Sequence, residues 1–324
     1  MLSETLCPFA LKMKKPVNKL IVAALTLVIV QSTAAAKVAG QREISFPQAV
    51  PVGTLVTPKA GFSLLDSKFE SVPLGKAQGK VQVPADKDII LVADYHIVEG
   101  PNLLKQVADG AVAGIHISDV EAVDATMEQL SHFKSLRRLA IRQVEVSDAG
   151  MKYLKPLTNL EVLIVVRSLV KGSTVFELPL KKLLLLDLSY QDLDHRGLQN
   201  ITRFDSLTEL KLSNTLISDD DLKAIGKLSK LERLDLTGNK HVTDRGLEYL
   251  KGLKHLTHLD IRRTSVTTQG LRQLKELPLR RIVLPEPAYT QSQLREIGKF
   301  LKGCKLIWKP EGKKEDMDLF APLH

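Results

Sequence analysis

The chain has 324 residues, 44% of them hydrophobic and 26% charged, which excludes an intrinsically disordered protein. Its 46 Lys and Arg residues against 37 acidic residues give a net charge of +9, and without residues 1–36 the balance falls to 42 against 36, an excess that indicates solubility rather than nucleic-acid binding. The two cysteines, Cys7 and Cys304, provide neither a disulfide framework nor a cysteine-based metal site.

Residues 1–36 are typical of a secretory signal peptide. Four lysines, the last of them Lys19, precede an apolar run from Leu20 to Val30, and Ala34 to Ala36 form a small-residue cleavage site. A bilayer span needs about 18 or more apolar residues, so an uncleaved anchor is the weaker alternative. We expect cleavage after Ala36 and a secreted, periplasmic or cell-envelope protein that meets the membrane only through this segment. Met13 is an alternative start.

Residues 37–88 are expected to form a small N-terminal β cap. Prolines and glycines divide this segment into short runs, residues 80–84 alternate in period two, and no helical periodicity appears. A repeat array needs such a cap because its first unit would otherwise expose an apolar face.

Residues 89–308 contain a repeated aliphatic pattern. Aliphatic residues at positions 1, 4 and 6 recur eight times, and the middle positions are separated by 23 to 25 residues. Ile90 and Val92 indicate a degenerate earlier unit, and Leu306 to Trp308 are expected to close the stack before a flexible tail at 309–324. The middle positions, which we call anchors, are Ile115, Leu139, Leu163, Leu186, Leu210, Leu234, Leu259 and Ile282.

The second half of each unit predicts a short helix. Twelve residues after most anchors, and again three residues later, stand apolar residues such as Met151 and Leu154, which share one helical face. Between strand and helix stands a turn such as Ser147-Asp148 or Thr243-Asp244, whose Ser or Thr and Asp can cap the helix, and capping is also the favoured interpretation of Asp219 to Asp221 over a calcium loop. The unit at 160–182 lacks this Asp, so its convex side is expected to be irregular.

Neither half of a unit can bury its apolar face alone, so the units are expected to stack. The predicted fold is α/β: a right-handed solenoid of about eight to nine repeats of about 24 residues, with a parallel β-sheet on the concave face and helices on the convex face.

At Leu207 to Asp219 and Leu256 to Thr268 the sequence resembles the leucine-rich repeat family, through the pattern Leu-x-x-Leu-x-Leu-x-x-Thr. It is similar to exported bacterial members and to the repeat arrays of F-box proteins. The resemblance implies a horseshoe with a concave sheet, and protein binding more often than catalysis. Residues 37–88 offer no helical F-box, so ubiquitin-ligase substrate recognition is disfavoured.

The concave sheet is the expected binding face. Side chains alternate along a strand, so residues one before and one, three and four after each anchor are expected to point away from the core. Val162, Ile164, Val166 and Leu185 form a predicted apolar patch beside Arg142, Arg167 and Tyr190, and Arg138 precedes them on the same face. A predicted basic patch contains Arg233, His258, Arg262, Arg263 and Arg281, with Asp235 and Asp260 between them.

Each patch has a second interpretation. The apolar patch can be covered by an inward loop, and the basic patch can be a solvated face of Arg and Asp pairs. The sequence therefore predicts an exported, non-enzymatic scaffold that binds a protein, with an acidic envelope polymer as the alternative ligand, and with no nucleic acid and no cofactor. His255 and His258 are expected on opposite faces of a strand and so form no metal site. The rival hypotheses are a hydrolase of envelope polymers and a purely structural envelope protein.

Overall fold

The computed structural model describes residues 40–66, 70–100, 102–121, 124–285 and 289–308. The signal segment predicted at 1–36 and the tail predicted at 309–324 lie outside the described residues.

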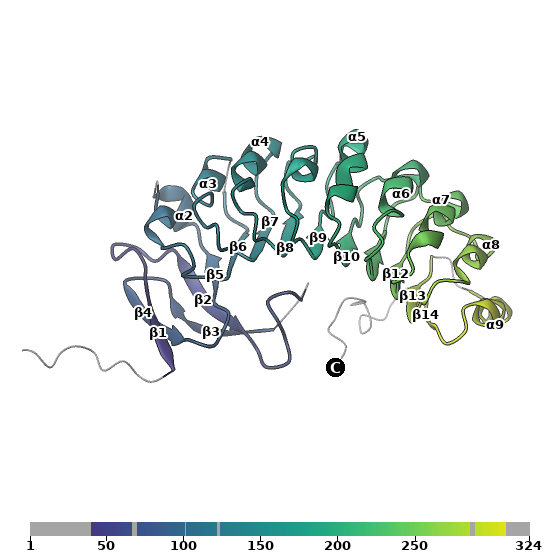
Figure 1. The fold of residues 1–324 in the computed structure, drawn as a ribbon, viewed down its shortest axis with the longest axis horizontal. Helices are drawn as coiled ribbons and strands as arrows, with labels where there is room; N and C mark the ends of the chain where they lie inside the picture. Colours follow the sequence, from purple (N-terminus) through teal and green to yellow (C-terminus); the bar gives the residue numbers. More distant parts are fainter. Residues whose placement is uncertain (1–39, 67–69, 101, 122–123, 286–288, 309–324) are drawn as a thin grey trace, which may run out of the picture.

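Within these residues the strands form an arched twelve-stranded sheet and a separate two-stranded sheet (Figure 1). The order of the large sheet is β14-β13-β12-β11-β10-β9-β8-β7-β6-β5-β2-β3, and the small sheet pairs β1 with β4. The strands are β1 (Gln41–Ser45), β2 (Gly53–Pro58), β3 (Ser71–Lys76), β4 (Lys80–Pro84), β5 (Ile90–Ala93), β6 (Gly114–Ser118), β7 (Arg138–Arg142), β8 (Val162–Val166), β9 (Leu185–Asp187), β10 (Glu209–Lys211), β11 (Arg233–Asp235), β12 (His258–Asp260), β13 (Arg281–Val283) and β14 (Lys305–Ile307).

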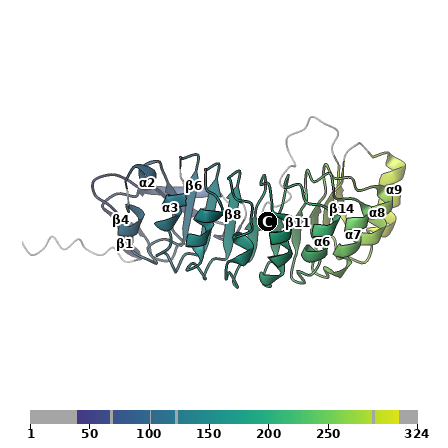
Figure 2. The same ribbon diagram turned by 90° about the horizontal axis from the view of Figure 1, so that it is seen from above.

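Short helices cover the convex side of the arch, and Figure 2 shows them stacked in a row when the molecule is seen from above. They are α2 (His96–Glu99), α3 (Asp124–Glu128), α4 (Asp148–Met151), α5 (His195–Leu198), α6 (Asp219–Ile225), α7 (Asp244–Tyr249), α8 (Thr268–Leu271) and α9 (Gln291–Phe300). The 3₁₀ turns are η1 (Leu104–Gln106), η2 (Lys152–Leu154), η3 (Val175–Glu177), η4 (Gln199–Arg203), η5 (Leu250–Gly252) and η6 (Arg272–Leu274). In the part of the chain that is described, none of these helices has the length and apolarity required to cross a bilayer.

The repeat pattern places one continuous core between the sheet and the helices. Every anchor, together with the aliphatic residues three before and two after it, belongs to a single buried cluster. The apolar pairs of the helical halves, such as Met151 and Leu154, join the same cluster. The parallel solenoid predicted from the repeats is therefore confirmed. The unit at 160–182 has only η3 on its convex side, as its missing Asp indicated.

In the first unit, the register of the strand differs from the prediction by one residue. Leu91, not Ile90, pairs with the anchor Ile115 in the parallel ladder of β5 and β6. A shift of one residue exchanges the two faces of a strand. Leu91 and Ala93 therefore lie in the main core, while Ile90 packs on the other side of the sheet with Val56 and Leu64.

The segment before the repeats is built from β-strands that extend the sheet. Strand β2 pairs antiparallel with β5 on one side and with β3 on the other. At the opposite end, β14 continues the parallel ladder, with Leu306 paired to Ile282, as its spacing of 24 residues predicted.

Aspartates at the starts of the helices connect neighbouring repeats. Oδ1 and Oδ2 of Asp219 accept hydrogen bonds from the backbone N–H and the hydroxyl of Thr243, one repeat later, at 2.8 and 2.6 Å. Asp124 and Asp244 bind Ser147 and Thr267 in the same way. The Ser or Thr also caps its own helix, as predicted. The sequence indicated the cap but did not indicate the bond between repeats.

These aspartates require glycine in the helix of the next repeat. A Cβ added to Gly246 would overlap the Asp219 carboxylate, and one added to Gly270 would overlap that of Asp244. The pairing of Asp and Gly in successive units is therefore a packing requirement of the stack.

Candidate functional site

The concave side of the sheet presents two parallel rows of side chains in register. The first row precedes the anchors, and the second row follows them. The first row contains Arg138, Val162, Leu185, Glu209, Arg233, His258, Arg281 and Lys305, and the second contains His116, Ala140, Ile164, Asp187, Lys211, Asp235, Asp260 and Val283.

The predicted apolar patch lies on the concave side but is buried. Val162, Ile164, Val166 and Leu185 are at most 8% exposed and form, with Ala140, a cluster separate from the main core. Leu65, from the loop between β2 and β3, packs against this cluster. The expectation that these four side chains form an open binding surface is wrong, and the alternative of an inward loop describes them better.

Arg138 holds this loop to the concave face. Its Nη1 donates to the carbonyl oxygens of Leu64 and Asp66 at 2.9 and 2.8 Å. Its Nε donates to Nε2 of His116 at 2.8 Å, and only 2% of the residue is exposed. Burial, followed by the charges of Arg138 and Arg142, lowers the pKa of His116 to about 3. Arg138, predicted as a binding residue, therefore contacts the chain itself.

The predicted basic patch is divided between the two rows. Arg233, His258 and Arg281 lie in the first row, while Asp235 and Asp260 are neighbours in the second row. Arg262 Nε binds both carboxylate oxygens of the fully buried Asp260 at 3.0 Å. The charge of Arg262 is thus balanced by Asp260 of its own unit. The positive charge of the patch that is not balanced in this way lies in the first row, at the starts of the strands.

The fourth residue after the anchor lies in a turn in the repeats up to Leu259, where this position is described. Arg167, Tyr190 and Arg263 have φ between 53° and 60°, and Gln143 and Asn214 share this left-handed conformation. Strand alternation therefore does not apply to this position, because β9 to β13 end one residue after the anchor. Arg167 and Tyr190 are nevertheless exposed, and the guanidinium of Arg167 lies 4.7 Å from the centre of the Tyr190 ring.

Two apolar side chains that the sequence analysis missed lie in the same turns. Leu169 and Leu216, each six residues after an anchor, are 62% and 57% exposed. We call Arg167, Leu169, Tyr190 and Leu216 the strand-end edge. Leu169 and Leu216 share one position, six residues after an anchor, and this shared position is the signal that could have identified them.

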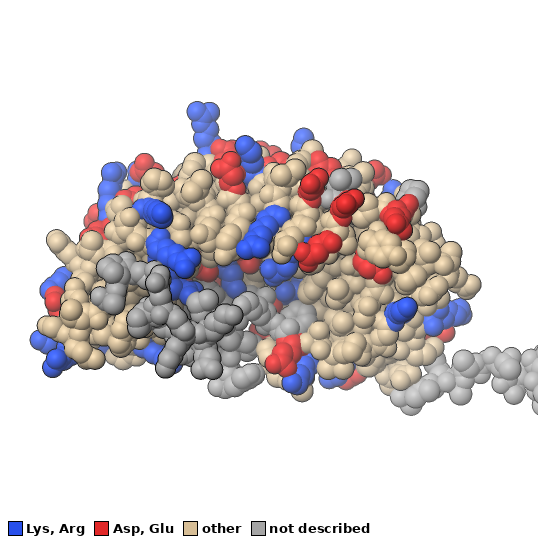
Figure 3. Space-filling view, turned by 180° about the vertical axis from the view of Figure 1, so that it is seen from behind, with Lys and Arg blue, Asp and Glu red and all other residues tan. Residues whose placement is uncertain are grey.

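His255 and His258 line one cavity of about 360 Å³, which corrects the expectation that they lie on opposite faces. His255 lies in the turn before β12, so strand alternation does not extend to it. Across the described ranges, no group of three or more His, Cys, Asp or Glu side chains is arranged to hold a metal ion. On the face of the molecule shown in Figure 3, basic and acidic side chains are interspersed.

The lowered pKa of His258 should make the free energy of unfolding depend on pH. Burial, followed by the charges of Arg233, Arg281 and Arg280, lowers its pKa to about 4. The unfolded chain takes up this proton near pH 6.5 and the folded chain only near pH 4, so this contribution to stability falls as the pH falls through that window. We expect wild type to lose about 1–2 kcal/mol relative to His258→Asn between pH 7 and pH 5, measured by denaturant unfolding. His241→Asn, at an exposed histidine, is the control, and an identical pH profile for all three proteins would contradict the assignment.

The comparisons with known proteins match short parts of the chain. A leucine-rich repeat family model matches residues 227–251. A histone of Tetrahymena thermophila is 36% identical over 93 residues, which cover 29% of this chain and 21% of that protein. Leucine-rich repeat-containing protein 42 of Xenopus tropicalis is 39% identical over 104 residues, 28% of this chain and 25% of that protein. The chain thus spans about a fifth to a quarter of the length of these relatives.

Solved structures resemble the arch at low sequence identity. An internalin of Listeria monocytogenes is 20% identical with a TM-score of 0.44, and the alignment covers 64% of this chain and 62% of that chain. A leucine-rich repeat protein of Leptospira interrogans is 20% identical with a TM-score of 0.42, covering 61% and 55%.

The matched segment 227–251 runs from the end of one repeat into the helix of the next, within an array whose units all bury the same positions. The repeated sequence, the parallel solenoid and this match agree: the chain is built from leucine-rich repeats.

Proposed function

We propose that the protein is a non-enzymatic scaffold that binds a protein partner through the strand-end edge. The observation that carries this proposal is the exposure of Leu169, Tyr190 and Leu216, three large apolar side chains in equivalent turns of the array. Aromatic and Arg side chains are enriched in protein interfaces, and Arg167 stacked on Tyr190 has this composition. Solenoids present such extended surfaces because each repeat displays the same loop at the same edge.

Two tyrosines provide a matched test of this edge. A photo-crosslinking phenylalanine analogue at Tyr190 should capture a protein partner in the native host, while the same analogue at Tyr153, an exposed tyrosine on the convex side, should not. Tyr190→Asn should weaken binding of the captured partner about thirtyfold, because aromatic interface residues contribute about 2 kcal/mol or more. Asn accepts the left-handed turn, so the fold should be retained. Equal crosslinking at both positions would contradict the proposal.

We also propose that the protein is exported. The support is the basic, apolar and small-residue succession within residues 1–36. Mass spectrometry of the protein from its host should find a mature N-terminus at Lys37. A protein that begins at Met1 or Met13 and remains in the cytoplasm would contradict this proposal.

A further inference from the structure

The cavity beside His258 lies where β11, β12 and β13 begin. It has a volume of about 360 Å³, and its lining includes Arg233, Lys254, Thr257, His258 and Arg280. Arg233 is half-buried, Lys254 and Arg280 are exposed, and His258 is 3% exposed. The cavity therefore combines accessible cations with one buried imidazole.

The cations of this cavity carry no carboxylate partner among the described residues. Arg233, Lys254 and Arg280 form no ion pair there, and Glu232 is the one acidic side chain in the described lining. Three positive charges and one negative charge leave a net charge of +2 at neutral pH. A small dianion would balance that charge.

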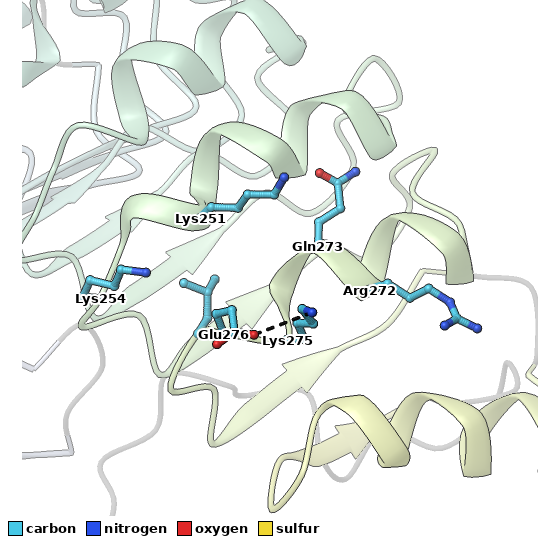
Figure 4. Close-up of a pocket in the computed structure, with 7 residues that line it drawn as sticks. Lys251, Lys254, Arg272, Gln273, Lys275 and Glu276 are labelled. Carbon is cyan, nitrogen blue, oxygen red and sulfur yellow. Dashed lines mark ion pairs between the residues drawn. The ribbon is translucent and has the colours of Figure 1, made fainter.

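A neighbouring cavity shows the contrast. It has a volume of about 430 Å³ and shares Lys254 with the first cavity (Figure 4). There Lys275 pairs with Glu276 at 3.8 Å and Lys251 pairs with Glu248 at 3.3 Å, while Arg272 is bound to Glu296. Three of the four cations that line this cavity are therefore already paired, and the fourth is the shared Lys254, which leaves the His258 cavity as the better anion site.

The tautomer of His258 narrows the choice of anion. The Thr257 hydroxyl donates to the carbonyl oxygen of Glu232 at 3.1 Å, so its oxygen accepts from Nδ1–H of His258 at 2.9 Å. Nε2 of the neutral ring is then a hydrogen-bond acceptor. Arg233 on β11 and Arg280 and Arg281 at β13 surround the ring and oppose its protonation, while Asp260, on its own strand, is held by Arg262.

An anion that carries its own proton fits this arrangement. Phosphomonoesters have a second pKa near 6, so at pH 6.5 a fraction of them still bears a P–OH group. Inorganic phosphate has a higher second pKa and bears a P–OH group both as the monoanion and as the dianion, whereas sulfate bears no proton at this pH. The P–OH can donate to Nε2, and the remaining oxygens can accept from the guanidinium and ammonium groups.

We propose that this cavity is a phosphate-binding site, in which Arg233, Lys254 and Arg280 contact the anionic oxygens and Nε2 of His258 accepts from the protonated oxygen. The site lies apart from the strand-end edge, and the proposal does not depend on a protein partner.

Calorimetric titration of the full-length protein at pH 6.5 and constant ionic strength tests the site. Inorganic phosphate and glycerol phosphate should both bind saturably, and the tighter of the two distinguishes a free ion from a phosphomonoester as the natural ligand. The double variant Arg233→Ala with Arg280→Ala should lose at least tenfold in affinity. Lys254→Ala should also lose affinity. Because Lys254 is exposed, this variant should fold normally, so it tests the site even if the double variant does not fold. The control Lys275→Ala removes one charge from the neighbouring cavity and should change affinity less than twofold.

Three results would overturn the proposal. They are the absence of saturable phosphate binding, equal binding by the folded double variant and wild type, and equal affinity for sulfate and phosphate. Loss of partner capture in Tyr190→Asn with unchanged phosphate binding would separate this site from the proposed protein interface.

Discussion

Replacing Gly246 by Ala should lower the free energy of unfolding by about 3 kcal/mol. The added Cβ would overlap the carboxylate of Asp219, which is held in place by its hydrogen bonds to Thr243. Either the helix or the carboxylate must move, and the cost combines overpacking with weakened charge-assisted bonds. Urea unfolding monitored by circular dichroism measures the change.

Gly298→Ala is the matched control for this substitution. Gly298 lies within α9 on its exposed side, and a Cβ there would meet no atom within 4 Å. Because Ala favours a helix over Gly, this variant should be more stable by about 0.5–1 kcal/mol. Equal effects of the two substitutions would mean that the contact between Asp and Gly is not a constraint on the stack.

Replacing Arg138 by Ala should release the loop between β2 and β3 from the concave face. The substitution removes the donors to the carbonyl oxygens of Leu64 and Asp66 and leaves a space beside His116. We expect a loss of about 3 kcal/mol, because hydrogen bonds to charged groups contribute about 1.5–3 kcal/mol each. Hydrogen exchange should accelerate in residues 59–66 before it does so in the repeats.

The adjacent Arg137 provides the comparison. Its side chain is 38% exposed and pairs with Glu161 at 2.9 Å and Asp88 at 3.4 Å. Exposed ion pairs contribute about 1 kcal/mol or less, so Arg137→Ala should have a small effect. A loop that stays protected in Arg138→Ala would show that other contacts hold it.

The core of this fold was predictable because its signal is repeated. Each anchor is preceded and followed by aliphatic residues at fixed spacing, and in the structure all of them enter one cluster. Where the repeat is degenerate, the predicted register was wrong by one residue. Strand β5 contains three successive aliphatic residues, Ile90 to Val92, and alternation alone cannot decide which of them face the core.

The concave surface was less predictable because its properties depend on segments far away in the sequence. Val162 and Ile164 face the predicted side, but their burial involves Leu65, about a hundred residues earlier in the chain. Tyr190 was identified by a strand rule that does not hold at its left-handed turn, and it proved exposed for a different reason. His255 was misplaced for a related reason, since its strand begins three residues later.

The bond from Asp to the Ser or Thr of the following repeat gives the array a direction. Asp244 still finds Thr267, but the residue after Thr267 is Thr268 rather than Asp, so the series ends there. A unit inside this series carries both the Ser or Thr that donates to the Asp of the preceding unit and the Asp that accepts from the Ser or Thr of the following unit. Gene duplication could therefore lengthen the arch in steps of one whole unit, while a fractional step would separate each aspartate from its intended partner.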